Sequence, residues 1–453
     1  MRAQVFALVA MLAAANVVVA APAHRNNSLE ALARKAVSES APESATAIEE
    51  LRSRGPAGLQ ALLDAYAAEV GAAREGLPAD ASPDANRRWQ RLRAALDRVA
   101  AQRDSYASGL YWYTDFVRAK AAAKMSRKPI LSLRLLGRLD EDLSCANSRF
   151  FRTTLYSNAE VSRFLRERFV LHWESVRPVP KVTIDFGDGR KLERTLTGNS
   201  IHYVLDLEGR PVDALPGLYG ARAFLRVLAS AEHAASTCAN AGSAQEREAL
   251  LREYHKARVG ELEGEWAADL AKARIATPPS RDARPAAAPD VSPTAEQAAR
   301  GAITKMMVVE RPVLRGTSSN PRALDPTADD AAWARIGELY SADARLDGSS
   351  RSLIRSKNPG AYADREKFEG VIRNLERAIA EDTARNKYLV EAKLHGWFVA
   401  GDWTKDVRGL NEKVYSELFL TPSSDPWLGL FPRDAYTAIE NDGVHSTRSP
   451  SNF

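Results

Sequence analysis

Cys145 and Ser148 are the two residues of this sequence whose types and spacing most directly suggest chemistry, because they stand one turn apart where a helical stretch is expected to begin. A thiol at a helix N-terminus faces free backbone N–H groups and the positive end of the helix dipole, which favour its thiolate. Cys145 could then attack a disulfide, with Ser148 donating a hydrogen bond to the sulfur. Release of the mixed disulfide needs a second thiol, which serine cannot supply. The pair therefore predicts single-thiol chemistry at most, and a small buried cysteine without reactivity is the interpretation we favour.

The residues around Cys145 disfavour a reactive thiolate, and the rest of the sequence lacks the motifs of common metal and cofactor sites. Acidic residues 140–142 precede Cys145, and nearby negative charge disfavours a thiolate. Two cysteines, Cys145 and Cys238, are too few for a disulfide scaffold, a four-thiolate zinc site or an iron–sulfur cluster. The seven histidines show no His-x-x-x-His or His-Glu-x-x-His spacing, and no glycine-rich phosphate loop or serine-hydrolase elbow is present. We therefore expect neither a metal nor another cofactor.

The charge of the chain argues little for a nucleic-acid partner. Lys and Arg number 63 and Asp and Glu number 58, so the net charge of +5 is spread over 453 residues. Nucleic-acid binding usually requires basic residues concentrated on one face or in one block.

Residues 106–237 must position Cys145, and helical and strand patterns alternate along them, which predicts an α/β unit. Either Ser157 or Asn158 is expected to cap a helix within this unit. A Glu208-Gly209 pair predicts the turn of a hairpin. The expected elements are, in order, a helix over 114–125, a buried strand over 129–136, a helical stretch after Cys145, a helix after residue 158, a strand over 169–173, a hairpin over 201–217 and a closing helix over 221–236.

Four pieces of this unit together resemble the thioredoxin-like domains of exported bacterial proteins. They are Lys128-Pro129-Ile130 before the first strand, Cys145 to Ser148 ahead of a helix, Glu160-Val161 leading to Phe169-Val170, and Val204 to Gly209 followed by Pro216-Gly217. The resemblance covers under a third of the chain. It implies a thioredoxin-like domain, with a mixed sheet flanked by helices and Cys145 at the first position of the redox motif.

The departures from that family bear on function. The family motif is Cys-x-x-Cys, and here Ser148 occupies its second position, which gives a degenerate Cys-x-x-Ser motif. The family places a cis-proline before the hairpin strand, and here residues 200–203 read Ser-Ile-His-Tyr. The resemblance thus brings His202 towards Cys145, and a Cys–His pair could activate the thiol. Cys238 ends the closing helix, about 24 Å from the level of Cys145 at 1.5 Å per residue, so we expect no disulfide between the two cysteines.

Outside the α/β unit the chain is expected to be mainly helical. Arg2 followed by an apolar run and small residues is typical of a secretory signal peptide. No later run is long enough to span a membrane. The expected divisions are a signal peptide (1–23), a helical region (24–105), the thioredoxin-like domain (106–237), a helical extension (238–275), a Pro/Ala-rich linker (276–298), a helical C-terminal domain (299–440) and a disordered tail (441–453).

Two functions remain open from the sequence. The first is a periplasmic or extracellular protein whose thioredoxin-like domain is a non-catalytic binding or assembly module for other exported proteins. The second is a thiol–disulfide oxidoreductase relative that acts through Cys145 alone, with Ser148 and His202 as its other candidate site residues. The missing second cysteine and the missing cis-proline favour the first.

Overall fold

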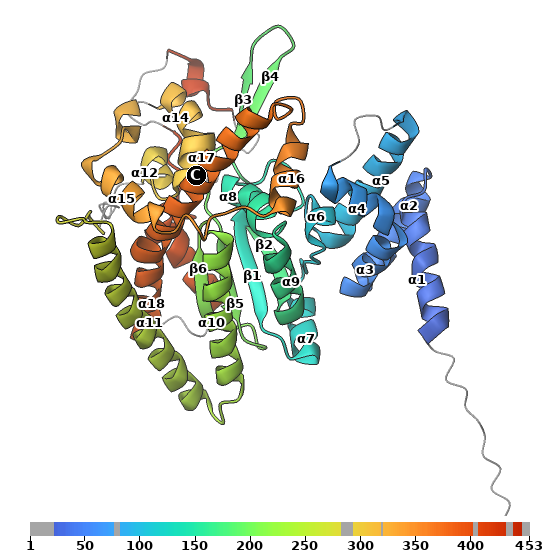
Figure 1. Ribbon diagram of the computed structural model, residues 1–453, viewed down its shortest axis with the longest axis horizontal. Coiled ribbons are helices and arrows are strands. Elements are labelled where there is room, and N and C mark those ends of the chain that lie inside the picture. The colour runs from blue at the N-terminus through green and yellow to red at the C-terminus, as the bar shows by residue number, and fades with distance from the viewer. Residues whose placement is uncertain are drawn as a thin grey trace, which may run out of the picture.

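The computed structural model describes residues 22–76, 82–281, 293–318, 320–401, 406–431 and 438–445, and it is a mixed α/β structure in which helices surround a small mixed sheet (Figure 1). Nearly all of the expected signal peptide (1–21) lies outside the described residues, as do residues 282–292 of the expected linker and residues 446–453 of the expected tail. Within the described part of the chain, no helix is long and apolar enough to cross a membrane.

The N-terminal helices enclose a hydrophobic core of their own, to which Leu51, Leu62 and Leu96 contribute. Two of these helices approach closely at Leu51 and Gly58, because a Cβ on Gly58 would lie 1.9 Å from the carbonyl oxygen of Leu51. The helices are α1 (Pro22–Ala36), α2 (Ala41–Ser53), α3 (Pro56–Ala65), α4 (Ala67–Glu75), α5 (Pro83–Ala100) and α6 (Ser105–Ser108).

The central sheet has four strands in the order β2-β1-β5-β6. The strands are β1 (Ile130–Leu136), β2 (Val170–Arg177), β5 (Ile201–Leu205) and β6 (Pro211–Pro216). β1 runs parallel to β2 and antiparallel to β5, and β6 is antiparallel to β5. Every residue of β1, β5 and β6 is buried, as expected for strands covered on both faces. A separate two-stranded hairpin, β3 (Lys181–Asp185) and β4 (Lys191–Thr195), projects from the body (Figure 1).

The helices of the α/β unit begin where their caps dictate. Asp115 caps the first, accepting from the amides of residues 117 and 118, so this helix starts at residue 116 and not at 114. Of the two expected caps of the later helix, Asn158 is the one used, and its side-chain oxygen Oδ1 accepts from the amides of residues 160 and 161. The helices are α7 (Phe116–Ser126), α8 (Ala146–Phe150), which continues as a π-helical turn (Phe151–Leu155), α9 (Ala159–Arg168), α10 (Ala221–Ala239) and α11 (Ala244–Lys272).

The C-terminal helices contribute to two hydrophobic cores: one is continuous with the sheet and joins residues such as Leu133 of β1 to Trp333 and Phe398, and the other is smaller and contains Ile303 and Leu314. They are α12 (Ala295–Ala299), α13 (Ile303–Lys305), α14 (Arg311–Thr317), α15 (Ala328–Glu338), α16 (Gly348–Lys357), α17 (Arg365–Arg385), α18 (Ala392–Ala400) and α19 (Val407–Lys413). π-helical turns at Met306–Glu310, Asn386–Glu391 and Val414–Leu418 and 3-10 turns at Pro321–Leu324 and Glu440–Gly443 accompany them. The helix α12 begins inside the expected linker and ends one residue beyond it, and the last 3-10 turn enters the expected tail. The division of the chain into domains stays a prediction.

Candidate functional site

Cys145 is the N-cap residue of α8, directly after the loop that leaves β1. Its backbone N–H donates to the carbonyl of Leu136, the last residue of β1, which fixes the thiol at the end of that strand. The thiol is enclosed, because only 1% of the residue is exposed. Its hydrogen-bonding neighbour is Ser200, whose Oγ lies 2.9 Å from the Cys145 Sγ and is likewise buried.

The other two candidate residues from the sequence are engaged elsewhere. The Ser148 hydroxyl lies 2.7 Å from Ser144 Oγ and 2.8 Å from the Cys145 carbonyl oxygen, so it is held by its own turn of helix. His202 Nε2 lies 2.6 Å from the Tyr156 hydroxyl, and its ring packs among aromatic side chains. The structure thus pairs Cys145 with Ser200, and His202, which was considered as a partner for the thiol, pairs with Tyr156 instead.

Burial dominates the electrostatics of this region. Burial lowers the pKa of His202 to about 3, so the ring is neutral near pH 7 and offers no positive charge to a thiolate. Burial also raises the pKa of Tyr156 well above its ordinary value, and negative charge on Cys145 would raise it further. Arg149 lies within electrostatic reach of Cys145, and burial lowers the pKa of this guanidinium. Arg149 donates to the Ser144 carbonyl at 3.0 Å and to Thr195 Oγ1 at 2.8 Å, which ties the loop before Cys145 to the end of β4.

Residues 195–200 cover the thiol, and C-terminal residues cover that segment in turn. Gly198 allows the close approach, since a Cβ there would lie 3.3 Å from the Cβ of Cys145. The Tyr415 hydroxyl donates to the Asn199 carbonyl at 2.9 Å, and the Lys305 ammonium donates to the Gly198 carbonyl at 3.4 Å. Lys305 is itself fully buried and lies 3.5 Å from the carboxylate of Glu310. Two layers of chain therefore separate Cys145 from solvent on this side.

Cys238 lies in the last turn of α10 and is a free thiol, as is Cys145. Burial raises the pKa of the Cys238 thiol, and this disfavours its reactive form.

Sequence reasoning missed Ser200. A signal was present, because the resemblance stated above directs attention to residues 200–203, and Ser200 lies in that segment two residues before His202. Without the structure, nothing decided which of the two residues would meet the thiol.

The chain was compared with protein-family models, with curated proteins and with solved structures. None of the three comparisons found a match.

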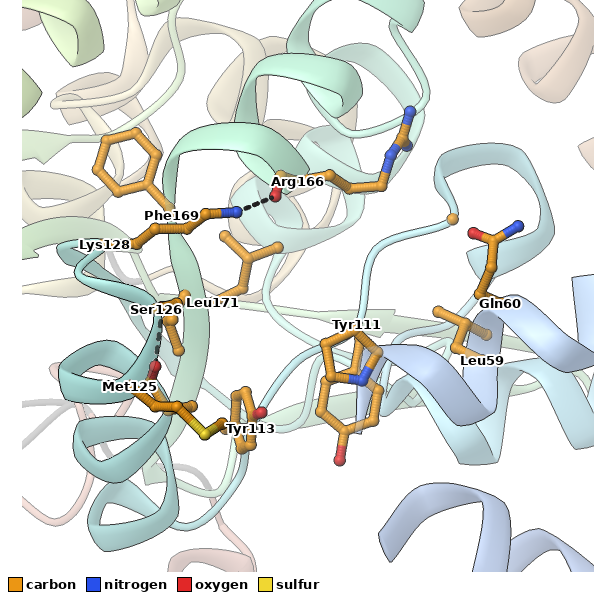
Figure 2. Close-up of a pocket in the computed structure, with 14 residues that line it drawn as sticks. Leu59, Gln60, Tyr111, Tyr113, Met125, Ser126, Lys128, Arg166, Phe169 and Leu171 are labelled. Atoms are coloured by element: carbon orange, nitrogen blue, oxygen red, sulfur yellow. Dashed lines mark hydrogen bonds between the residues drawn. The ribbon is translucent and has the colours of Figure 1, made fainter. Parts of the chain in front are cut away.

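A second feature of the surface is a groove of about 300 Å³ between α3, α7 and the start of β2 (Figure 2). Its lining is mainly apolar, and Met125 at its edge is 86% exposed. Lys128 and Arg166 contribute positive charge, and no acidic side chain is found among the described residues that line it. The lining residues are Pro56, Leu59, Gln60, Gly109, Tyr111, Tyr113, Ala122, Met125, Ser126, Lys128, Arg166, Phe169, Val170 and Leu171.

The two cations are held in place at the groove. The Lys128 ammonium donates to the Arg166 carbonyl at 3.1 Å, as the dashed line in Figure 2 marks. The Arg166 guanidinium donates to the Ser108 carbonyl. These carbonyl partners carry no charge, so the groove combines an apolar lining with a basic edge, although Glu167 lies within electrostatic reach of Arg166.

Proposed function

We propose that this chain is an exported, non-catalytic thioredoxin-like protein that serves as a binding or assembly module. The strand order supports the thioredoxin-like part of the proposal, since a parallel β1–β2 pair is followed by an antiparallel β5–β6 hairpin. The place of Cys145 supports it too, because this residue opens the helical segment that follows β1.

The observation that carries the non-catalytic part is the burial of Cys145. Thiol–disulfide exchange requires the attacking sulfur to reach a disulfide sulfur of the substrate directly. With 1% of Cys145 exposed and residues 195–200 packed over it, a protein disulfide has no path to the sulfur in this conformation. Ser148 cannot act as the resolving residue, because it has no thiol. Its hydroxyl is in any case hydrogen-bonded within its own helical turn.

The groove of Figure 2 is the surface we assign to binding. Its occupant is an extended segment of another exported protein that carries apolar side chains and at least one carboxylate. The apolar lining accounts for the first requirement, and the positive charges of Lys128 and Arg166, unaccompanied by an acidic lining residue, account for the second.

A disulfide-reduction assay tests the absence of catalysis. Reduction of a small disulfide peptide by dithiothreitol is followed with and without the wild-type protein, Cys145→Ser, and Cys238→Ser as the matched control. We expect all three proteins to leave the uncatalysed rate unchanged. A wild-type rate at least tenfold above background that is lost only in Cys145→Ser would contradict the proposal and establish the single-cysteine oxidoreductase.

Two fluorescein-labelled peptides test the groove. One contains leucines and a glutamate, and the other has lysine in place of the glutamate. We expect the acidic peptide to bind more tightly, and Lys128→Glu to abolish the preference. Lys124→Glu, in the last turn of α7 and outside the lining, serves as the charge control. Equal binding of both peptides to the wild type would remove the groove from the proposal.

Mass spectrometry of exported protein tests the proposed location, with a mature N-terminus expected at residue 21 or 24.

A further inference from the structure

Three metal-ligating side chains from distant parts of the sequence meet behind the sheet. Asp213 comes from β6, His255 from α11 and His395 from α18. One ligand atom of each lies within 4.8 Å of the others, and all three residues are at most 1% exposed. The packing of α11 against α18 and of both against the sheet therefore creates a polar cluster in an otherwise apolar region.

The hydrogen bonds of the two rings determine which nitrogen of each carries a proton. His255 Nε2 lies 3.0 Å from the Val212 carbonyl oxygen, which can only accept, so this nitrogen is an N–H. His395 Nε2 lies 3.4 Å from Glu391 Oε1, a carboxylate oxygen that also accepts from Arg258. This arrangement makes His395 Nε2 an N–H as well. Both Nδ1 atoms are then left to face each other.

The Nδ1 atoms of His255 and His395 are 2.7 Å apart. Two neutral rings with both Nε2 atoms protonated would direct two lone pairs at each other across this distance, and such a contact is repulsive. Either a ring proton, which includes an Nδ1–H that one ring donates to the other, or a metal ion must therefore stand between the two nitrogens.

We propose that Asp213, His255 and His395 bind one divalent transition-metal ion, for which zinc is the best-suited candidate. Two imidazole nitrogens and one carboxylate oxygen form a ligand set typical of zinc, with a further position left for water. Zinc–nitrogen distances of about 2.0–2.1 Å in a tetrahedral site place neighbouring ligand atoms about 3.3 Å apart. The present separations of 2.7 Å between the rings and 3.9 Å between His395 Nδ1 and Asp213 Oδ1 lie on either side of that value.

The groups behind the three ligands match those of established metal sites. Metal-bound histidines usually donate their second N–H to a carboxylate or a backbone carbonyl, and metal-bound carboxylates are themselves hydrogen-bonded. Here Glu391 and the Val212 carbonyl receive the two ring N–H groups, and the Tyr254 hydroxyl donates to Asp213 Oδ2 at 2.6 Å. A lone buried histidine would need none of this arrangement.

The metal would fasten the sheet to the C-terminal helices. Its ligands span residues 213 to 395, so binding would remove conformational freedom from a long stretch of unfolded chain. The inference is independent of the groove and of Cys145, because none of the ligands or their partners belongs to either feature.

Metal analysis of the full-length purified protein, stripped with a chelator and dialysed, tests the proposal. We expect one equivalent of zinc to rebind, and one equivalent of cobalt(II) to give the intense visible absorption of a four-coordinate site. His395→Gln and Asp213→Asn should lose at least about tenfold in affinity. Glu391→Gln should weaken binding about 10–100-fold, as changes behind a metal ligand do. His233→Gln, an exposed histidine on α10, is the matched control and should bind like the wild type.

The wild-type protein alone can overturn the proposal, so poor folding of a variant does not leave it open. If folded wild-type protein, verified by circular dichroism, bound zinc and cobalt no better than His395→Gln, the site would not exist. Nitrogen NMR showing an Nδ1–H shared by the two rings and unchanged on addition of zinc would identify the cation as a proton. Equal loss of binding in His233→Gln would place the metal elsewhere.

Discussion

The burial of Cys145 makes a quantitative prediction about Tyr415, the residue that closes the outer layer over the thiol. The Tyr415 side chain is 1% exposed, and its hydroxyl donates to the Asn199 carbonyl in the segment that covers Cys145. Burial raises the pKa of Tyr415 well above its ordinary value, and charge on Cys145 contributes to the same shift, so the two side chains are within electrostatic reach. Tyr415→Ala should open the cover without touching the thiol itself.

The size of the effect follows from the truncation. Replacing a buried aromatic side chain by alanine costs about 3–5 kcal/mol. Part of this cost arises because the Asn199 carbonyl would lose the hydrogen bond that the Tyr415 hydroxyl donates to it. If about 3 kcal/mol of the cost lowers the free energy of opening the cover, the population of open molecules rises roughly 100-fold, at about 1.4 kcal/mol per factor of ten.

The assay is the rate at which a thiol reagent modifies Cys145 under native conditions, in a Cys238→Ser background so that a single thiol reports. We expect the wild-type rate to be far below that of an unfolded control, and Tyr415→Ala to react roughly 100-fold faster than the wild type. Phe368→Ala is the matched control, because Phe368 is also 1% exposed but packs on Tyr362 and Arg355. Equal acceleration by both variants would mean that reaction follows global unfolding, and a wild-type rate equal to the unfolded control would refute the buried-thiol argument.

Three further changes test the packing. The pKa of His202 is about 3 in the folded protein and near 6.5 in the unfolded chain. Between these pH values the unfolded state binds more protons, so the free energy of unfolding falls as the pH decreases. His202→Gln should make this slope shallower by up to about 1.4 kcal/mol per pH unit, as measured by urea unfolding. Lys305→Met should cost about 3–5 kcal/mol by isolating Glu310, and adding Glu310→Leu should recover most of it; equal stabilities of the single and double variants would contradict this. Gly58→Ala should lower the thermal midpoint, because its Cβ would overlap Leu51.

Local pattern was sufficient to predict most elements of the α/β unit. The strand expected over 129–136 is found at Ile130–Leu136, and the closing helix expected over 221–236 is found at Ala221–Ala239. These predictions succeeded because continuous apolar runs, caps and turn residues act over a few neighbouring positions. The ends were less accurate where a cap decided them, as Asp115 did for α7.

The contacts that build the candidate sites arise between distant segments, and local pattern contains little information about them. Cys145 and Ser200 are 55 residues apart, and His255 and His395 are 140 apart. A partial signal existed for the histidines, because His255 shares the buried side of α11 with Leu251 and Leu262. A histidine on such an apolar helical face must have a partner, but the sequence did not say which.

The C-terminal residues are the common cause of both features. Lys305 and Tyr415 close the end of the sheet at Cys145, and α18 brings His395 to the ring of His255. Without these C-terminal residues, the segment over Cys145 would lose its outer layer, and the cluster would lack His395. Different elements carry the two features, but Tyr415 of the cover and Leu394 and Phe398 of α18 belong to the same continuous hydrophobic core. If zinc fastens α18 to the sheet, removing it should also loosen the C-terminal cover, so chelation should accelerate modification of Cys145 in the wild type and leave the rate in His395→Gln unchanged.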